Sequence, residues 1–233
     1  VGIGLMYGIL LPNNFNFPYR ADSIQDFWRR WHITLSVWFR DYLYIPLGGS
    51  KVTKRKAIRN TFIIFIVSGF WHGANWTFIV WGALNALYFL PLLLTKNNRN
   101  NIEIVATNGN LPTPKEFLSI LITFGLTVIA WIFFRAENIG HALSYISNIF
   151  SSSLFSFPYL IEPESNHIIF PAKLIIVIMI FTLIEWFGRT QQFAIANLRI
   201  YKYSILRYIF YFSLIIFIFL MGGSKEQFIY FQF

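Results

Sequence analysis

The residue best placed for acid–base chemistry is His72, which lies in a long stretch without any charged side chain. No Asp, Glu, Lys or Arg occurs from Thr61 to Thr95, and the centre of this stretch reads FWHGANW over residues 70–76. A polar or ionisable group is costly to place in a membrane core, so it is a functional candidate by default. The competing, structural interpretation is a neutral histidine that bonds a backbone carbonyl inside a helix bundle.

The rest of the chain offers His72 no protein nucleophile and no metal-binding motif. It contains no cysteine, no Gly-x-Ser-x-Gly pattern and no His-Glu-x-x-His pattern. A neutral imidazole can take a proton from a hydroxyl group at neutral pH. This chemistry suits the direct attack of an alcohol on an activated acyl group. It suits a proton relay in a transporter equally well.

Other titratable groups have simpler explanations when each is considered alone. His32 follows the sequence WRRW and is typical of a histidine at a surface or membrane interface. Arg40 and Asp41 are adjacent and are most simply charges at the end of a helix. Glu185 and Arg189 are four residues apart, which is the spacing of a local ion pair on a helix.

The composition that surrounds these residues is that of an integral membrane protein. Hydrophobic residues make up 56% of the chain and charged residues only 12%, whereas soluble domains carry about 25% charged residues. Charge-free stretches cover residues 1–19, 61–95, 117–134, 174–184 and 208–224. A helix needs roughly 17–25 apolar residues to cross a bilayer, so four of the five stretches are long enough. The stretch at 174–184 is too short by itself and must extend back through residues 168–170.

The distribution of positive charge predicts the orientation of the chain. Nine of the 19 basic residues lie between residues 20 and 59, and the positive-inside rule places that segment in the cytoplasm. The same rule places the basic residues at 189–207 inside and the loop at 135–166 outside. We attribute the formal charge of +9 to this topology and not to nucleic-acid binding.

The stretch from Thr61 to Thr95 must then enter the membrane and return to the same side. Its turn is expected between Gly69 and Asn75. Eleven residues from 61 to 71 rise about 15 Å, or half of the hydrocarbon core. The sequence therefore predicts that His72 lies near mid-membrane, at a break between two helices.

The basic segment is predicted to form an amphipathic helix that lies at the membrane interface. Asp22 and Gln25 are spaced as a capping box, and apolar residues then recur at helical spacing. The helix is expected to end near Tyr44, since Pro46 disfavours helix before it. Residues 51–59 are expected to form a solvated loop.

Several motifs occur in order along the chain: FWRRWHITLS at 27–36, FRDYLYIPLGG at 39–49, WHGANW at 71–76, WIFFRA at 131–136 and FIYFQF at 228–233. Together these motifs resemble the membrane-bound O-acyltransferase family, and most closely its bacterial branch typified by the alginate O-acetyltransferase membrane subunit. The resemblance implies that His72 is the essential histidine of the family and that His32 is its second polar position. It also implies an acyl donor that approaches from the cytoplasm and a glycan acceptor outside.

The resemblance further implies that residues 1–233 are the C-terminal part of a single membrane domain, since family members run to roughly twice this length. The start at Val1, without a signal peptide, agrees with a missing N-terminal portion. The expected parts are the end of a membrane helix at 1–19, an interfacial basic segment at 20–59, the helix pair with His72 at 60–95, and further membrane helices and loops at 96–233. The expected fold is all-α, a polytopic membrane bundle with a broken, re-entrant helix pair.

The predicted function is O-acyl transfer to a cell-surface polysaccharide, in a multi-pass protein of the bacterial inner membrane. We expect His72 and His32 to be catalytic. We expect Asn75, Trp71, Trp76, Arg40 and Asp41 to bind or orient substrate, and Asn75 to do so if the helix continues past Gly73. No metal or bound cofactor is expected; the donor is an acyl thioester, and the expected partners are membrane lipid, the exopolysaccharide acceptor and a periplasmic acetyltransferase. The alternatives are an acyl relay to that periplasmic partner and a proton-coupled transporter.

Overall fold

The computed structural model describes residues 2–49, 51–95, 104–107, 109–155, 160–161, 168–169, 172–191, 193–195 and 203–221. These residues form helices joined by turns and loops, together with a two-residue antiparallel pair, β1 (Leu160–Ile161) and β2 (Ile168–Ile169). The helices are α1 (Gly2–Met6), α2 (Ile24–Arg30), α3 (Ile33–Phe39), α4 (Lys54–His72), α5 (Trp76–Leu94), α6 (Pro114–Arg135), α7 (Ile139–Ile149), α8 (Ala172–Phe187) and α9 (Ser204–Met221). The prediction of an all-helical fold class is thus confirmed in its general form.

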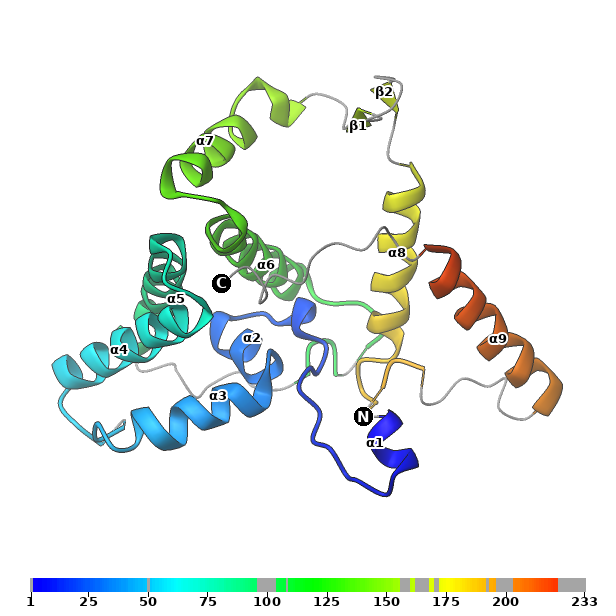
Figure 1. Cartoon of the computed structure of the whole chain (residues 1–233), viewed down its shortest axis with the longest axis horizontal. Helices are drawn as coiled ribbons and strands as arrows, with labels where there is room; N and C mark the ends of the chain where they lie inside the picture. Colours follow the sequence, from blue (N-terminus) through cyan, green and yellow to red (C-terminus); the bar gives the residue numbers. More distant parts are fainter. Residues whose placement is uncertain are drawn as a thin grey trace.

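Helices α4 and α5 form a closely packed antiparallel hairpin (Figure 1). A Cβ atom added to Gly69 would clash with the backbone carbonyl of Phe78, and one added to Gly82 would clash with that of Phe65. Glycine at these two positions therefore lets the helix backbones touch, which is the way small residues act at helix interfaces in membranes. At the other end of the hairpin, Lys54 Nζ donates to the carbonyl of Leu94 at 3.0 Å.

The hairpin turns at the residues that follow His72, so the predicted break between two helices is present. Gly73 has φ 155° and ψ 168°, a conformation that is essentially restricted to glycine. Asn75 then caps α5, where its side-chain oxygen accepts from the amide of Thr77 at 3.1 Å. The 19 residues of α5 rise about 28 Å, enough to cross a bilayer core. If α5 crosses the whole core, His72 lies near one face of the membrane, so its placement at mid-membrane stays a prediction.

Helix α6 packs across α5, and α7 packs in turn against α6. It begins with a capping box in which Thr113 and Glu116 bond each other's backbone amides, with proline at its first position. The buried core between these helices consists of Trp81, Ala130, Phe133 and Ala142. This core fixes the N-terminal part of α5, and hence the region around His72, against α6.

Helices α8 and α9 lie apart from this group (Figure 1). The predicted ion pair between Glu185 and Arg189 is not among those found for the described residues. Arg189 instead donates to the carbonyls of Val105 at 3.2 Å, Ala106 at 3.0 Å and Gly109 at 2.6 Å. A buried arginine thus ties the end of α8 to the loop that precedes α6.

The basic segment differs from its prediction in four ways. The helix is capped by Ser23 instead of Asp22, and it is divided at Trp31 and His32 into α2 and α3. A π-helical turn over Arg40–Tyr44 follows α3. The predicted solvated loop at 51–59 is wrong for its second part, because α4 already begins at Lys54.

In the remaining segments, helix α1 ends at Met6, and the segment predicted as an outer loop at 135–166 contains α7. By length and composition, two helices in the described part of the chain are able to cross a membrane, α5 and α6; α8 and α9 provide shorter apolar segments. The FIYFQF motif at 228–233, the basic residues 199 and 202, and the outer-loop acidic residues 162 and 164 lie outside the described residues.

Candidate active site

The two histidines of the predicted site line the same cavity. This cavity has a volume of about 530 Å³ and lies between α2, α3, α4 and α5. Its apolar wall includes Trp28, Leu35, Phe39, Ile64, Phe65, Trp81 and Phe89, and its polar residues include Gln25, Arg29, His32, Ser36, Arg40, Ser68 and His72. An apolar cavity with a few converging polar groups is the usual form of a small-molecule site. We call it the histidine cavity.

The ring of His72 is held between aromatic side chains from two other helices. His72 is the last residue of α4. Its ring packs edge-on against Trp81 of α5, with centroids 5.3 Å apart at 89°, and against Phe134 of α6, with centroids 4.9 Å apart at 80°. These are favourable edge-to-face arrangements. The imidazole is therefore kept in one place by packing, and it lines the same cavity as His32.

His32 occupies the break between α2 and α3 in a strained conformation. Its φ of 44° and ψ of 55° are left-handed, which costs a residue with a side chain about 1–2 kcal/mol. It stands at the N-cap position of α3, yet its side chain makes no cap hydrogen bond. Its Nδ1 atom is buried and has no hydrogen-bond partner among the described residues. Strain of this kind persists only where the surrounding structure holds it, and it often marks functional sites.

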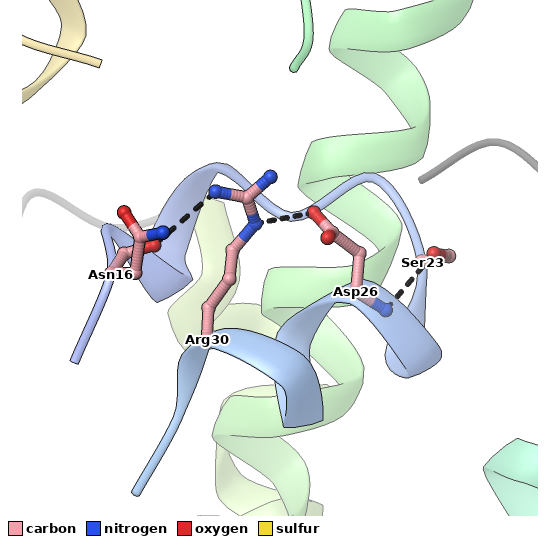
Figure 2. A network of polar contacts seen from close by, with 4 residues as sticks. All are labelled: Asn16, Ser23, Asp26 and Arg30. Atoms are coloured by element: carbon pink, nitrogen blue, oxygen red, sulfur yellow. Dashed lines mark hydrogen bonds and ion pairs between the residues drawn. The ribbon is translucent and has the colours of Figure 1, made fainter. Parts of the chain in front are cut away.

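Helix α2 is fixed beside this break by a buried polar network (Figure 2). Arg30 Nε donates to Asp26 at 2.6 Å, and the Arg30 guanidinium also donates to the carbonyl of Asn16 at 3.3 Å. Asp26 and Arg30 have only 2% and 7% of their surfaces exposed. At the start of the helix, the hydroxyl of Ser23 accepts from the amide of Asp26 at 3.3 Å.

Arg40 and Asp41 form an exposed ion pair at the edge of the cavity. Arg40 lines the cavity, and its Nε donates to Asp41 at 2.7 Å. This hydrogen bond from Arg40 holds the pKa of Asp41 below its usual value, and it raises the pKa of Arg40. Asp41 itself does not line the cavity. Arg40 is therefore the member of the pair that can offer its positive charge to a negatively charged ligand there.

The other predicted site residues lie away from the cavity wall. Because the chain is not helical past Gly73, Asn75 does not lie one helical turn from His72; its amide donates to the carbonyl of Glu137 at 2.8 Å while its oxygen caps α5. Trp71 is 51% exposed and Trp76 is 71% exposed. The ring of Trp71 nevertheless packs against the ring of His72, with centroids 4.9 Å apart at 74°. In the cavity wall itself the structure brings together His72, His32 and Arg40.

Sequence reasoning did not identify Trp81 and Phe134 as the aromatic residues that hold the ring of His72. Trp81 lies on α5 nine residues after His72 and within the same charge-free stretch, where its position on the hairpin could have been inferred from the turn at 73–75. Phe134 comes from a distant helix, and its contact with His72 depends on how α6 crosses α5. No local sequence pattern encodes that crossing.

Comparison with known proteins gives a consistent family. The family model that matches is the membrane-bound O-acyltransferase family, over residues 2–134, which is more than half of the chain. The chain is 46% identical over 149 residues to a peptidoglycan O-acetyltransferase of Helicobacter pylori, with 64% of this chain and 27% of that protein covered. It is 42% identical over 151 residues to a "Probable alginate O-acetylase" of Pseudomonas aeruginosa, with 65% and 27% covered.

A further relative is a teichoic acid D-alanyltransferase of Bacillus subtilis, 39% identical over 151 residues, with 60% of this chain and 36% of that protein covered. The chain thus matches about a quarter of the length of the first two relatives. The matched residues include both histidines and the whole histidine cavity. On this basis the chain belongs to the membrane-bound O-acyltransferase family, and it is a membrane protein.

Proposed function

We propose that the intact protein transfers an acyl group, expected to be acetyl, from a thioester donor to hydroxyl groups of a cell-surface polysaccharide. The observation that carries this proposal is that His72 and His32 line one cavity of about 530 Å³ in a chain of this family. Relatives named as acting on peptidoglycan, alginate and teichoic acid support a polymeric acceptor outside the cytoplasm.

The chemistry requires one base and no nucleophile from the protein. His72 takes the proton of an acceptor hydroxyl while the hydroxyl oxygen attacks the thioester carbonyl carbon. The carbon–sulfur bond then breaks, an ester forms, and the thiolate leaves with the proton returned by the imidazolium. Trp81 and Phe134 keep the ring in place, so little reorganisation is needed at the moment of transfer.

His32 is the second catalytic residue of the proposal. It faces the same cavity from the opposite helices and assists proton transfer or orients the donor. Arg40, at the cavity edge, offers a positive charge to the phosphate groups of coenzyme A or of an acyl carrier protein. The apolar wall excludes water, which would otherwise hydrolyse the thioester.

The proposed setting is the bacterial inner membrane, with several membrane crossings. The α4–α5 hairpin enters and returns, so the basic residues before α4 and the end of α5 share the cytoplasmic side. The donor then approaches from the cytoplasm and the acceptor from outside, where a periplasmic acetyltransferase is a candidate partner. In a relay, that partner receives the acyl group before the glycan does.

The test is to measure the O-acetyl content of the cell-surface polysaccharide in a strain that carries His72→Ala in the intact protein. We expect a loss of about 10²–10⁴-fold in transfer rate, which is the usual contribution of a general base. His141→Ala is the matched control, because His141 is an exposed histidine on α7. Wild-type ester content in the His72→Ala strain, at normal protein level, contradicts the proposal; flux of a substrate without any ester product identifies a transporter instead.

A further inference from the structure

A short segment before α2 holds the break at which His32 lies. We call Asn14, Phe15 and Asn16 the latch. The amide of Asn16 donates to the carbonyl of Arg30 at 2.9 Å, and the amide of Ile33 donates to the carbonyl of Asn14 at 2.9 Å. The latch therefore bonds the backbone on both sides of His32, in the manner of a short antiparallel pair.

Asn14 also replaces the missing cap of α3. Its side-chain oxygen accepts from the amide of Thr34 at 3.1 Å and from the hydroxyl of Thr34 at 2.5 Å. An N-cap side chain normally makes such a bond to one of the first amides of its own helix. Here the acceptor belongs to a residue 20 positions earlier in the chain. His32 occupies the N-cap position, but its side chain does not cap the helix.

No hydrogen bond to Nδ1 fixes the orientation of the His32 ring. Functional histidines are usually oriented by a bond from the second ring nitrogen, but Nδ1 of His32 is buried and has no partner among the described residues. The ring direction must then follow from the left-handed backbone and from packing. Phe15 of the latch supplies that packing, with its centroid 6.0 Å from the His32 ring and 4.9 Å from the Trp31 ring.

We propose that Asn14 is a positioning residue for His32. By capping α3 from outside the helix, it stabilises the left-handed turn that keeps the imidazole in the wall of the histidine cavity. The consequence for activity rests on the proposed function. The consequence for the position of the ring does not, because it concerns the structure alone.

The experiment measures how fast diethyl pyrocarbonate modifies His32, read by mass spectrometry of the intact protein in lipid nanodiscs. Asn14→Ala removes the cap and is expected to raise the reactivity of His32 several-fold, as the half-buried ring moves and its Nδ1 atom becomes exposed. Asn14→Asp keeps an oxygen acceptor at a helix N-terminus and is expected to behave as the wild-type protein does. The matched control is Asn138→Ala, which removes the equivalent cap from α7, where Asn138 accepts from the amide of His141 at 2.8 Å.

Unchanged His32 reactivity in folded Asn14→Ala overturns the proposal, and so does an equal rise in Asn138→Ala. If Asn14→Ala does not accumulate, Thr34→Val removes one of the two bonds to Asn14 and is expected to give a smaller rise; no rise there overturns the proposal as well. Ester formation is the second readout. Asn14→Ala is expected to slow it about tenfold in the wild-type protein and to add nothing in a His32→Ala background, as for two residues that act through one group.

Discussion

At the scale of single residues, burial separates two arginine–aspartate pairs of the same chemistry. Arg30 and Asp26 are 2.6 Å apart with side chains 9% and 3% exposed, whereas Arg40 and Asp41 are 2.7 Å apart with side chains 58% and 41% exposed. Water screens the second pair and is largely excluded from the first. The buried pair therefore has a structural role in α2, while the exposed pair is available for a ligand at the cavity edge.

Removal of one partner of each pair should have unequal effects on stability. Asp26→Ala leaves Arg30 charged and buried without its partner, a situation that typically costs about 3–5 kcal/mol. Asp41→Ala exposes Arg40 to water and should hardly change the thermal unfolding temperature. The two variants are compared by thermal unfolding of the purified protein, and equal shifts would contradict this account.

Asn75 illustrates how the structure changes the role of a predicted site residue. Both ends of its amide are used, one by Thr77 and one by Glu137. We expect Asn75→Ala to destabilise the protein by about 1 kcal/mol, as the loss of an N-cap does, and to leave the transfer rate of the folded fraction within a few-fold. A normal unfolding temperature together with a rate loss of about 10²-fold, the size expected for an oxyanion donor, would instead support a catalytic role.

At the scale of elements, the α4–α5 hairpin determines where His72 lies. Its two helices touch at Gly69 and Gly82, where added side-chain atoms would meet the opposing backbone. Gly125 of α6 differs, because a Cβ atom there would meet nothing within 4 Å. The chain therefore contains its own control for a glycine-to-alanine change in an apolar helix.

Gly69→Ala should separate the hairpin and displace His72. Overpacking of this kind costs about 1–3 kcal/mol, and a displacement of the base should also reduce the transfer rate. Gly125→Ala should be neutral or stabilising by up to about 1 kcal/mol, since alanine favours helix over glycine. Thermal unfolding and ester formation are measured for both variants. Equal behaviour of the two would show that close contact at Gly69 does not determine the geometry of the site.

At the scale of the whole molecule, charge and apolar length together predict the orientation. Basic residues precede α4. The segment between α6 and α8 contains no Lys or Arg after Arg135, the last residue of α6. Both ends of the α4–α5 hairpin lie together, as the bond from Lys54 to the Leu94 carbonyl requires. In the proposed topology the hairpin returns the chain to the side from which it entered, so α6 is expected to cross outward and to place α7 outside.

The orientation can be tested by cysteine labelling, because these 233 residues contain no native cysteine. Lys56→Cys, in the first turn of α4, should react with a membrane-impermeant maleimide only after the cells are opened. Ser147→Cys, exposed on α7, should react in intact cells, or in spheroplasts where an outer membrane is present. Labelling of both positions from the same side would refute the proposed topology.

The sequence predicted the break after His72 from Gly73 and Asn75, because these residue types have strong local preferences for turns and caps. It also predicted that His72 is a functional candidate, because a lone histidine in a charge-free stretch is unusual. The division of the basic segment at His32 could not be predicted in this way. That division depends on Asn14, which is 20 residues from its partner Thr34, and local periodicity carries no information about such a contact.

The most direct test of the central claim is the rate of ester formation by purified intact protein with an acyl-thioester donor and a polysaccharide acceptor. It is measured for the wild-type protein, His72→Ala, His32→Ala and the double variant. If the two histidines serve one transfer in one cavity, the double variant should be about as slow as His72→Ala alone, as for residues that act as a unit. Wild-type rates in His72→Ala, or losses that multiply independently in the double variant, would contradict that claim.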